Sequence, residues 1–200
     1  MANLLTRKLE AFAPLSEADR HLLDAVIREA RDVGSREDLI REGDAPGDVR
    51  LILAGFACRY KRLAGGKRQI MAYLVPGDFC DLHVFILKAM DHTIATLSPC
   101  RVVDIPRARI LEMTERPALA RALWWAALVD EATLREWLVN IGARPAEQRV
   151  AHLLCELLLG FPLRSGGFCK EPEHPRRMVW RRNEPEGGSP ASIRPKRFSA

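Results

Sequence analysis

The sequence lacks the long apolar run that a transmembrane helix requires. Its longest apolar stretches, Leu51–Cys58 and Trp124–Val129, are far shorter than the roughly 20 residues needed to cross a bilayer. The opening segment, MANLLTRKLEAF, also lacks the basic start, apolar stretch and small-residue cleavage site of a signal peptide. We therefore expect a cytoplasmic protein without a membrane partner.

Paired cysteines and common catalytic motifs are missing as well. The five cysteines, at positions 58, 80, 100, 155 and 169, form no CxxC pair, and a cytosolic location predicts thiols rather than disulfides. The chain contains no HExxH, GxGxxG, P-loop or nucleophile elbow. We assign no catalytic residue and predict that the protein is not an enzyme.

The chain has no net positive charge outside its C-terminal part. The net charge is +5, but residues 160–200 hold nine Lys/Arg against four Asp/Glu, whereas residues 1–159 hold 22 of each. The same 41 residues contain six prolines and five glycines and no apolar period. Such a composition buries too little surface to offset chain entropy, so we expect disorder there. The part expected to fold carries no net charge that would attract nucleic acid.

The N-terminal half contains one helix signal followed by many turn signals. Ser16 begins a capping box with Asp19, and the apolar residues after it share one helical face, which predicts a helix ending near Asp32. Between Val33 and Ile105, short apolar segments alternate with turn residues, a pattern typical of a sandwich or rolled barrel. Gly65-Gly66 predicts a hairpin tip. The expected strands are Val49–Leu53, Phe56–Leu63, Lys67–Tyr73, His92–Leu97 and Arg101–Ile105.

Helical patterns return after Ile105. We expect a short helix at Arg107–Met113, a long one that Pro117 starts and Gly142 ends, and a further helix beginning at Pro145. The long helix carries residues at alternating spacings of three and four, which predicts a seam for pairing with a second copy. This predicted dimerisation seam consists of Leu123, Ala127, Asp130, Leu134, Trp137 and Ile141.

Three segments in this order resemble the Crp/Fnr family of bacterial transcription regulators. EGDAPGDVRLILAGFACRY is similar to the opening motif of the family's β-roll, with Gly43, Gly47 and Gly55 at its turns. GGKRQIMAYLVPGDFCDL is similar to the central motif before the ligand cradle. ARPAEQRVAHLLCELLL is similar to the helix that leads from the dimerisation helix into the DNA-binding domain. The resemblance covers about residues 7–159.

The resemblance implies an α+β fold. It consists of an N-terminal helix, an antiparallel β-roll of the double-stranded β-helix or jelly-roll type, a long dimerisation helix, a further helix and a disordered tail. Residues 7–114 would form a cyclic-nucleotide-binding-like sensor domain, and residues 115–142 the dimerisation helix. Residues 143–159 would be the first helix of a truncated DNA-binding domain, followed by the tail at 160–200. A homodimer is the expected assembly, and the expected ligand is a small-molecule effector.

The resemblance also locates an effector-binding cradle, but its residues depart from the family pattern. In members that bind cyclic nucleotides, a Gly-Glu-Leu holds the ribose and a downstream Arg holds the phosphate. Here Asp81 takes the place of the Glu, and His92 that of the Arg. Since Arg presents a rigid cationic fork and His is mostly neutral at pH 7, we expect no tight binding of a cyclic nucleotide and leave the effector unidentified. The candidate effector-binding residues are Gly77, Asp78, Phe79, Asp81, Leu82, His92 and Thr93.

A second departure concerns DNA. Family members continue from the helix near Leu159 into a winged helix-turn-helix, which needs two apolar-periodic helices around a tight turn, and residues 160–200 contain neither. We hypothesise a frameshift that replaced this domain, so that DNA binding known for intact relatives is doubtful here. Two alternatives remain: a regulator that binds DNA through an atypical C-terminus, and an interaction protein that forms mixed dimers with full-length relatives.

Several residues allow both a functional and a structural interpretation. Cys80, Cys100, His83 and His92 could hold a metal, but their spacing is irregular and buried cysteines commonly act as small apolar groups; we assign no metal site.

The aromatic and charged residues leave similar choices. Trp124, Trp125 and Trp137 could line a pocket, although packing is the better interpretation. Asp130 could fix the dimer register or point outward. The basic hairpin, Arg59–Arg62 with Lys67-Arg68, could contact nucleic acid or be a solvated tip, and His152 with Glu156 would be an ordinary surface pair.

Overall fold

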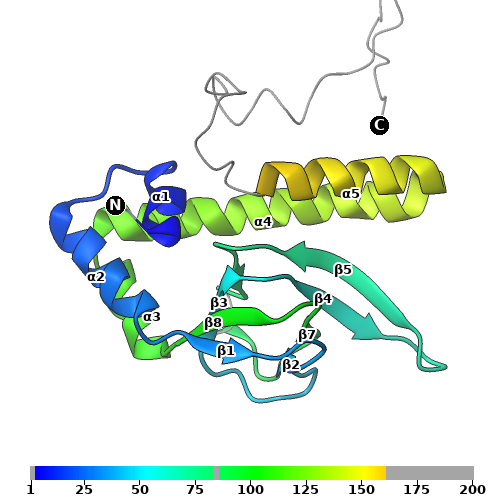
Figure 1. The fold of residues 1–200 in the computed structure, drawn as a ribbon, viewed down its shortest axis with the longest axis horizontal. Helices are drawn as coiled ribbons and strands as arrows, with labels where there is room; N and C mark the ends of the chain where they lie inside the picture. The colour runs from blue at the N-terminus through cyan, green and yellow to red at the C-terminus, as the bar shows by residue number, and fades with distance from the viewer. Residues whose placement is uncertain (1–2, 83–85, 161–200) are drawn as a thin grey trace, which may run out of the picture. The chain divides into compact units, whose positions relative to one another are not determined.

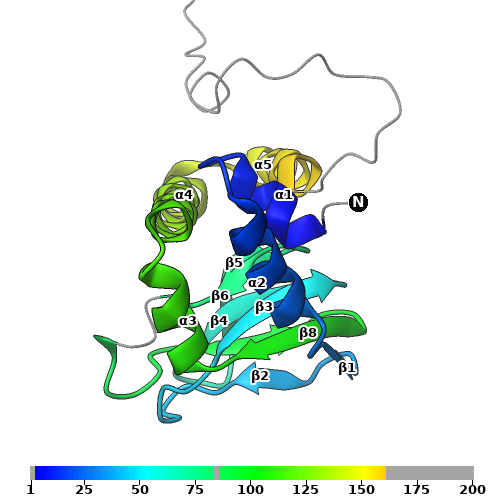
Figure 2. The same ribbon diagram turned by 90° about the vertical axis from the view of Figure 1, so that its left-hand side faces the viewer.

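Two four-stranded antiparallel sheets form a β-roll that is flanked by helices (Figures 1 and 2). The computed structural model describes residues 3–82 and 86–160, which lie within one unit, Met1–Pro162. One sheet has the strand order β1-β8-β3-β6 and the other β2-β7-β4-β5. The strands are β1 (Arg31–Val33), β2 (Asp38–Ile40), β3 (Val49–Ala54), β4 (Ala57–Arg62), β5 (Arg68–Leu74), β6 (Phe79–Cys80), β7 (Thr93–Thr96) and β8 (Cys100–Ile105).

The five longer strands confirm the expected ones to within a residue or two, whereas three short strands and one helix were not predicted. β1, β2 and β6 have two or three residues each, too few for a period of two to be visible. Helix α1 (Leu4–Glu10) begins at Asn3, whose side chain accepts a hydrogen bond from the Thr6 backbone N–H at 2.8 Å. The expected disorder of residues 161–200 and the frameshift hypothesis concern residues outside those the structure describes.

Helix α2 (Glu17–Ile27) has the predicted capping box but ends earlier than predicted. The Ser16 hydroxyl accepts from the Asp19 N–H, and the Asp19 carboxylate accepts from the Ser16 N–H at 3.0 Å. The helix ends at Ile27 rather than near Asp32 because the chain is already in β1 at Arg31, paired with Val102 of β8. Tertiary pairing thus overrides the local helical pattern.

Most of the glycines predicted at turns lie at turns, and one does not. Gly55 has φ +84°, and a Cβ there would lie 2.2 Å from the Pro99 carbonyl oxygen, so only glycine fits. Gly43 has φ +91° at a turn, and Gly65 and Gly66 form the β4–β5 hairpin tip, as predicted. Gly47 was wrongly assigned to a turn: it lies in an irregular segment without a positive φ or any close neighbour.

The main core lies between the sheets and the helices. Leu5 and Leu9 of α1, Leu51 of β3 and Val102 of β8 are completely buried together, and each such side chain contributes about 1.5–3 kcal/mol through burial. Leu119, from the first turn of α4, joins the same core. The first turn of α4 is therefore fixed to the β-roll by apolar packing.

The helices after the β-roll follow the predicted order. They are α3 (Arg107–Thr114), α4 (Pro117–Ala143) and α5 (Ala146–Gly160). Pro117 occupies the first turn of α4, where its missing N–H costs no hydrogen bond. At 1.5 Å per residue the 27 residues of α4 extend about 40 Å. α5 turns back along α4 after Arg144, on the side away from the sheets in the view of Figure 1.

Candidate effector cradle and dimerisation helix

The turn before β6 builds the wall of the cradle. Gly77 has φ +95° and donates its N–H to the Ile52 carbonyl at 2.7 Å. The Asp78 carboxylate accepts from the Val75 N–H at 2.9 Å and forms an ion pair with Lys8 of α1. Gly77 and Asp78 are thus used in shaping this turn and joining it to α1.

Phe79 and Leu82, on either side of the cradle's buried aspartate, are packing residues. Phe79 is buried in β6 opposite Leu51 of β3, and Leu82 is half-buried against the same core. Neither side chain contributes a polar group to the site. We infer that their part in the cradle is to hold the backbone of the intervening residues in place.

Asp81 is the central group of the cradle. Its backbone has φ +59°, a left-handed conformation rare outside glycine, and only 1% of the residue is exposed. One carboxylate oxygen, Oδ1, lies 3.0 Å from Nη2 of Arg59, and the other, Oδ2, lies 2.9 Å from Nε2 of His92. The position at which the family resemblance placed a ligand contact therefore holds an ion pair made by the chain itself.

His92 lies between two carboxylates. Its Nε2 faces Asp81, and its Nδ1 lies 2.7 Å from Oδ1 of Asp91. Burial lowers the pKa of His92, but the hydrogen bond and charge of Asp81, helped by Asp91, outweigh it, so the pKa is raised above its ordinary value. The raised pKa shifts His92 toward the imidazolium form relative to an ordinary histidine.

Arg59 completes the cluster and was missed as a site residue. It was assigned to a basic, solvated hairpin, but it lies in β4 with only 3% of its surface exposed. Its guanidinium contacts Asp81 and also Oδ2 of Asp130 on α4, at 3.3 Å. Burial lowers the pKa of Arg59, whereas the charges of Asp130 and Asp81 raise it, and the net pKa is raised. We call Arg59, Asp81, Asp91, His92 and Asp130 the cradle cluster.

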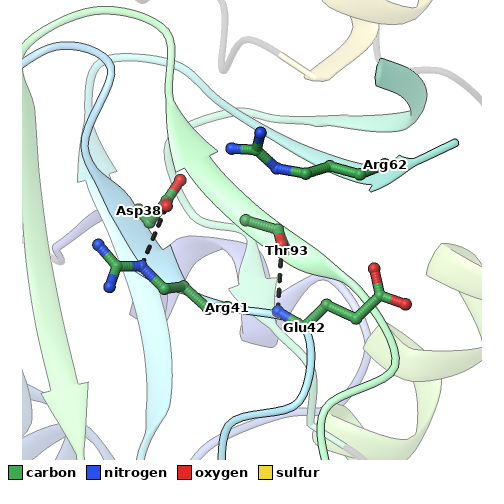
Figure 3. Close-up of a pocket in the computed structure, with 5 residues that line it drawn as sticks. All are labelled: Asp38, Arg41, Glu42, Arg62 and Thr93. Atoms are coloured by element: carbon green, nitrogen blue, oxygen red, sulfur yellow. Dashed lines mark hydrogen bonds and ion pairs between the residues drawn. The ribbon is translucent and has the colours of Figure 1, made fainter. Parts of the chain in front are cut away.

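Thr93 faces a different part of the β-roll. Its hydroxyl accepts a hydrogen bond from the Glu42 backbone N–H at 3.1 Å. It lines an open depression of about 550 Å³ between β2, β4 and β7 (Figure 3). Both signs of charge line this depression, and Asp38 binds Arg41 within it at 3.1 Å. The seven candidate effector-binding residues therefore do not converge: only Asp81 and His92 share a buried polar contact.

The cysteines named as possible metal ligands are packing residues. Cys80 is fully buried, and burial with the nearby Asp81 charge raises the pKa of its thiol strongly. The Cys100 thiol lies 3.2 Å from the Phe56 carbonyl oxygen and 3.3 Å from that of Ser98. Among residues 3–82 and 86–160, no three His, Cys, Asp or Glu side chains are arranged so that they could hold a metal ion; His83 lies outside these ranges.

Three of the six residues predicted for the dimerisation seam on α4 contact their own chain. Leu123 is buried in the main core, and Asp130 binds Arg59. Trp137 is buried, with its ring centroid 6.0 Å from that of Tyr73 and 5.5 Å from that of His152. These three side chains thus pack against or pair with their own chain, and the seam stays a prediction.

The residues that follow them are exposed instead. Trp124 is 61% and Leu138 73% exposed, and Glu131 is exposed as well. Together with the predicted positions that remain accessible, they preserve the three–four spacing of a two-helix seam. We define the exposed seam of α4 as Trp124, Ala127, Glu131, Leu134, Leu138 and Ile141.

His152 and Glu156 do not form a free surface pair. Both are half-buried against Trp137 where α5 meets α4, with Nε2 of His152 3.6 Å from Oε2 of Glu156. Arg144 joins the two helices by contacting Nδ1 of His152 at 3.2 Å and Glu136 at 3.0 Å. Burial raises the pKa of Glu156 to about 7, and burial together with Arg144 lowers that of His152. We call Glu136, Trp137, Arg144, His152 and Glu156 the joint cluster.

Comparison with known proteins gives consistent results for fold and family. Residues 30–116 match the family model described as "Cyclic nucleotide-binding domain". The nitrogen fixation regulation protein FixK of Bradyrhizobium diazoefficiens is 31% identical over 144 residues, which are 66% of this chain and 58% of that protein. The transcriptional activator protein anr of Pseudomonas aeruginosa is 25% identical, over 85% of this chain and 68% of its own.

Solved structures support the same fold. FixK2 from Bradyrhizobium japonicum matches with a TM-score of 0.58 and 23% identity, covering 64% of each chain. The catabolite activator protein of Thermus thermophilus matches with a TM-score of 0.50 and 18% identity, covering 76% of this chain and 63% of that one.

The chain spans only part of its relatives, 58% of one and 61% of another. No helix among the described residues is long and apolar enough to cross a membrane. Three observations point to the same kind of protein. They are the ordered motifs, the β-roll followed by a long helix, and the similarity to curated transcription regulators. The chain is similar to transcription regulators of the Crp/Fnr family, and its residues 30–116 match the cyclic nucleotide-binding domain that such regulators contain.

Proposed function

We propose that this chain is a Crp/Fnr-type regulator chain that forms a homodimer through the exposed seam of α4. The observation that carries the proposal is that seam: an apolar stripe with Trp124 and Leu138 largely exposed on a helix anchored to the β-roll at Leu119. An exposed apolar stripe of this length on a soluble domain marks an interaction site. A two-fold mate would cover it with the same residues, as isologous contacts require.

We propose further that the β-roll responds to a small effector that is not a cyclic nucleotide. The cradle cluster supports this, because the Arg59 guanidinium already neutralises the buried carboxylate at the ribose-contact position. A nucleotide would have to displace an ion pair between side chains that are at most 4% exposed, and breaking such a pair is costly. Calorimetry with cyclic AMP and cyclic GMP tests this proposal, and micromolar binding of either would contradict it.

Sequence-specific DNA binding is proposed to be absent from this form of the chain. The support is the composition of residues 160–200, which lacks the two apolar-periodic helices of a helix-turn-helix. The experiment is a gel shift with specific and random duplexes over a salt series. Binding of both duplexes alike, lost with added salt, fits contacts to phosphates alone. A sequence preference that survives salt would instead establish an intact regulator with an atypical C-terminus.

The dimer proposal is tested with Leu138→Glu, which places a charge in the exposed seam. We expect sedimentation to show monomers with an unchanged far-UV spectrum. Leu111→Glu on α3 is the matched control, because Leu111 is also an exposed leucine but lies away from the seam. Dimers that persist in Leu138→Glu would contradict the proposal. Co-expression with a full-length relative then tests the mixed-dimer alternative, which strictly homodimeric products would exclude.

A further inference from the structure

The cradle cluster reaches beyond the β-roll to α4, and one side chain makes the connection. Arg59 lies inside the roll on β4, yet its Nη1 is 3.3 Å from Asp130 in the middle of α4. Among the described residues, no other ion pair joins a β-strand to α4. The same half of α4 also packs against β5, where the ring centroids of Tyr73 and Trp137 lie 6.0 Å apart.

The two ends of this connection differ in environment. The Arg59 and Asp81 side chains are 4% and 0% exposed, whereas Asp130 is 40% exposed. The inner pair is therefore held rigidly by burial, because separating it would leave an uncompensated charge in the roll. The outer pair is open to solvent and weaker, so it can break without unfolding the roll.

We propose that Arg59 is a positioning residue that sets the place of α4 against the β-roll through Asp130 while no effector is bound. The guanidinium has enough donors to serve both carboxylates at once, because its fork presents N–H groups in two directions. The consequence is a cradle whose state is set by the chain's own charges. The inference deepens the proposed function and rests on it for one point only, the identification of α4 as the dimerisation helix.

The experiment is hydrogen exchange of Asp130→Asn, which breaks the outer pair and leaves the Arg59–Asp81 pair intact. We expect faster exchange of α4 amides around residues 126–134, with β4 and β6 amides unchanged. Glu131→Gln is the matched control: it removes the adjacent carboxylate, which pairs with Arg135 in solvent. The proteins are compared at equal dimer fraction, measured by sedimentation. Equal protection of α4 in Asp130→Asn and Glu131→Gln would overturn the proposal.

A second variant separates the connection from general destabilisation. Arg59→Lys keeps one positive charge in the roll but has no fork to hold both carboxylates. We expect Arg59→Lys to deprotect α4 as Asp130→Asn does, and the double variant to add nothing further, because both changes remove the same contact. Additive effects would contradict the proposal. Independent action would mean that the two residues are not coupled.

The ligand arm uses cyclic AMP and inorganic phosphate as probes. We expect neither probe to change the exchange of α4 amides in the unsubstituted protein. The reason is that Arg59, the cation that an anion would need, is already paired with Asp81 and Asp130. Protection of α4 by either probe would show that a ligand sets its position and would overturn the inference. Failure of dimerisation would instead appear as monomers in sedimentation, so failure of the proposed function is distinguished from failure of the inference.

Discussion

The cradle cluster and the joint cluster are both groups of charged side chains packed against α4, but they differ in how closely their opposite charges approach each other. In the cradle cluster, Asp81 lies between two cations at about 3 Å. In the joint cluster, His152 and Glu156 are 3.6 Å apart, and the amide of Asn140, completely buried one turn from Trp137, has no hydrogen-bond partner among the described residues. Matched buried charges make a rigid site, whereas unmatched ones leave little to hold two elements together. We infer that the Arg59–Asp81 pair inside the roll is firm, whereas the docking of α5 is weak.

The largest expected effect comes from breaking the better matched cluster. Arg59→Ala leaves Asp81 buried without its guanidinium, and removing one partner of a buried pair costs about 3–5 kcal/mol. Urea unfolding would measure the loss. Arg62→Ala is the control, since Arg62 lies on the same strand but is exposed, and its change should stay within about 0.5 kcal/mol. Similar losses for both variants would mean that the cradle cluster contributes no special stability.

Glu156→Gln sharpens the comparison through pH. The carboxyl group has a pKa of about 7 when α5 is docked, above its ordinary value of 4.5. A raised pKa contributes stability below the ordinary value that is lost as pH rises through the docked value, on the order of 1–3 kcal/mol across this window. We expect the protection factors of α5 amides, corrected for the intrinsic pH dependence of exchange, to be lower at pH 8 than at pH 5, and Glu156→Gln to remove this difference. A pH difference that persists in the variant would assign it to another group.

His92→Gln tests the cradle cluster in the same way. Here too stability is lost as pH rises, but over a higher pH range than for Glu156. The pKa of His92 is raised above 6.5, so its contribution is complete below 6.5 and is lost as pH rises through the raised value. Each unit of that shift corresponds to about 1.4 kcal/mol. We expect unfolding free energies of the unsubstituted protein to fall above pH 6.5 and those of His92→Gln to fall less. Parallel pH profiles for the two proteins would contradict the assignment.

The smallest effect should be a gain. Asn140→Leu replaces a buried amide that lacks partners with an apolar side chain of similar size, which we expect to stabilise the protein by about 1 kcal/mol. Thermal unfolding is the measurement. Asn140→Asp is the opposing control, because it would bury a charge at the same position. A loss of stability in Asn140→Leu would show that the Asn140 amide is satisfied in solution, and that the joint cluster is better matched than the structure shows.

The long strands, the capping box of α2 and the first residue of α4 were predictable because each depends on a local pattern. In each of these patterns, residues only a few positions apart determine the local structure. The examples are Pro117 at the start of α4, Ser16 with Asp19 in the capping box, and Gly65-Gly66 at the hairpin tip. The early end of α2 was not predictable, because pairing between Arg31 and Val102 decides it. The candidate site followed the same division: Asp81 and His92 were found from the resemblance, whereas Arg59 was taken for a solvated charge.

What the sequence determined by itself is the kind of fold and the spacing of its contacts. Helical periodicity on α4 specified a stripe of residues at intervals of three and four, but two such stripes lie one residue apart and both are largely apolar. Only the packing of α4 against the β-roll decided that Leu123, Asp130 and Trp137 face inward and that Trp124, Glu131 and Leu138 remain exposed. The burial of Arg59 was decided in the same way, because Asp81 and Asp130 lie 22 and 71 residues from it in the chain. An ion pair between residues so far apart in sequence has no local pattern, so it exists only once the fold has brought its charges together.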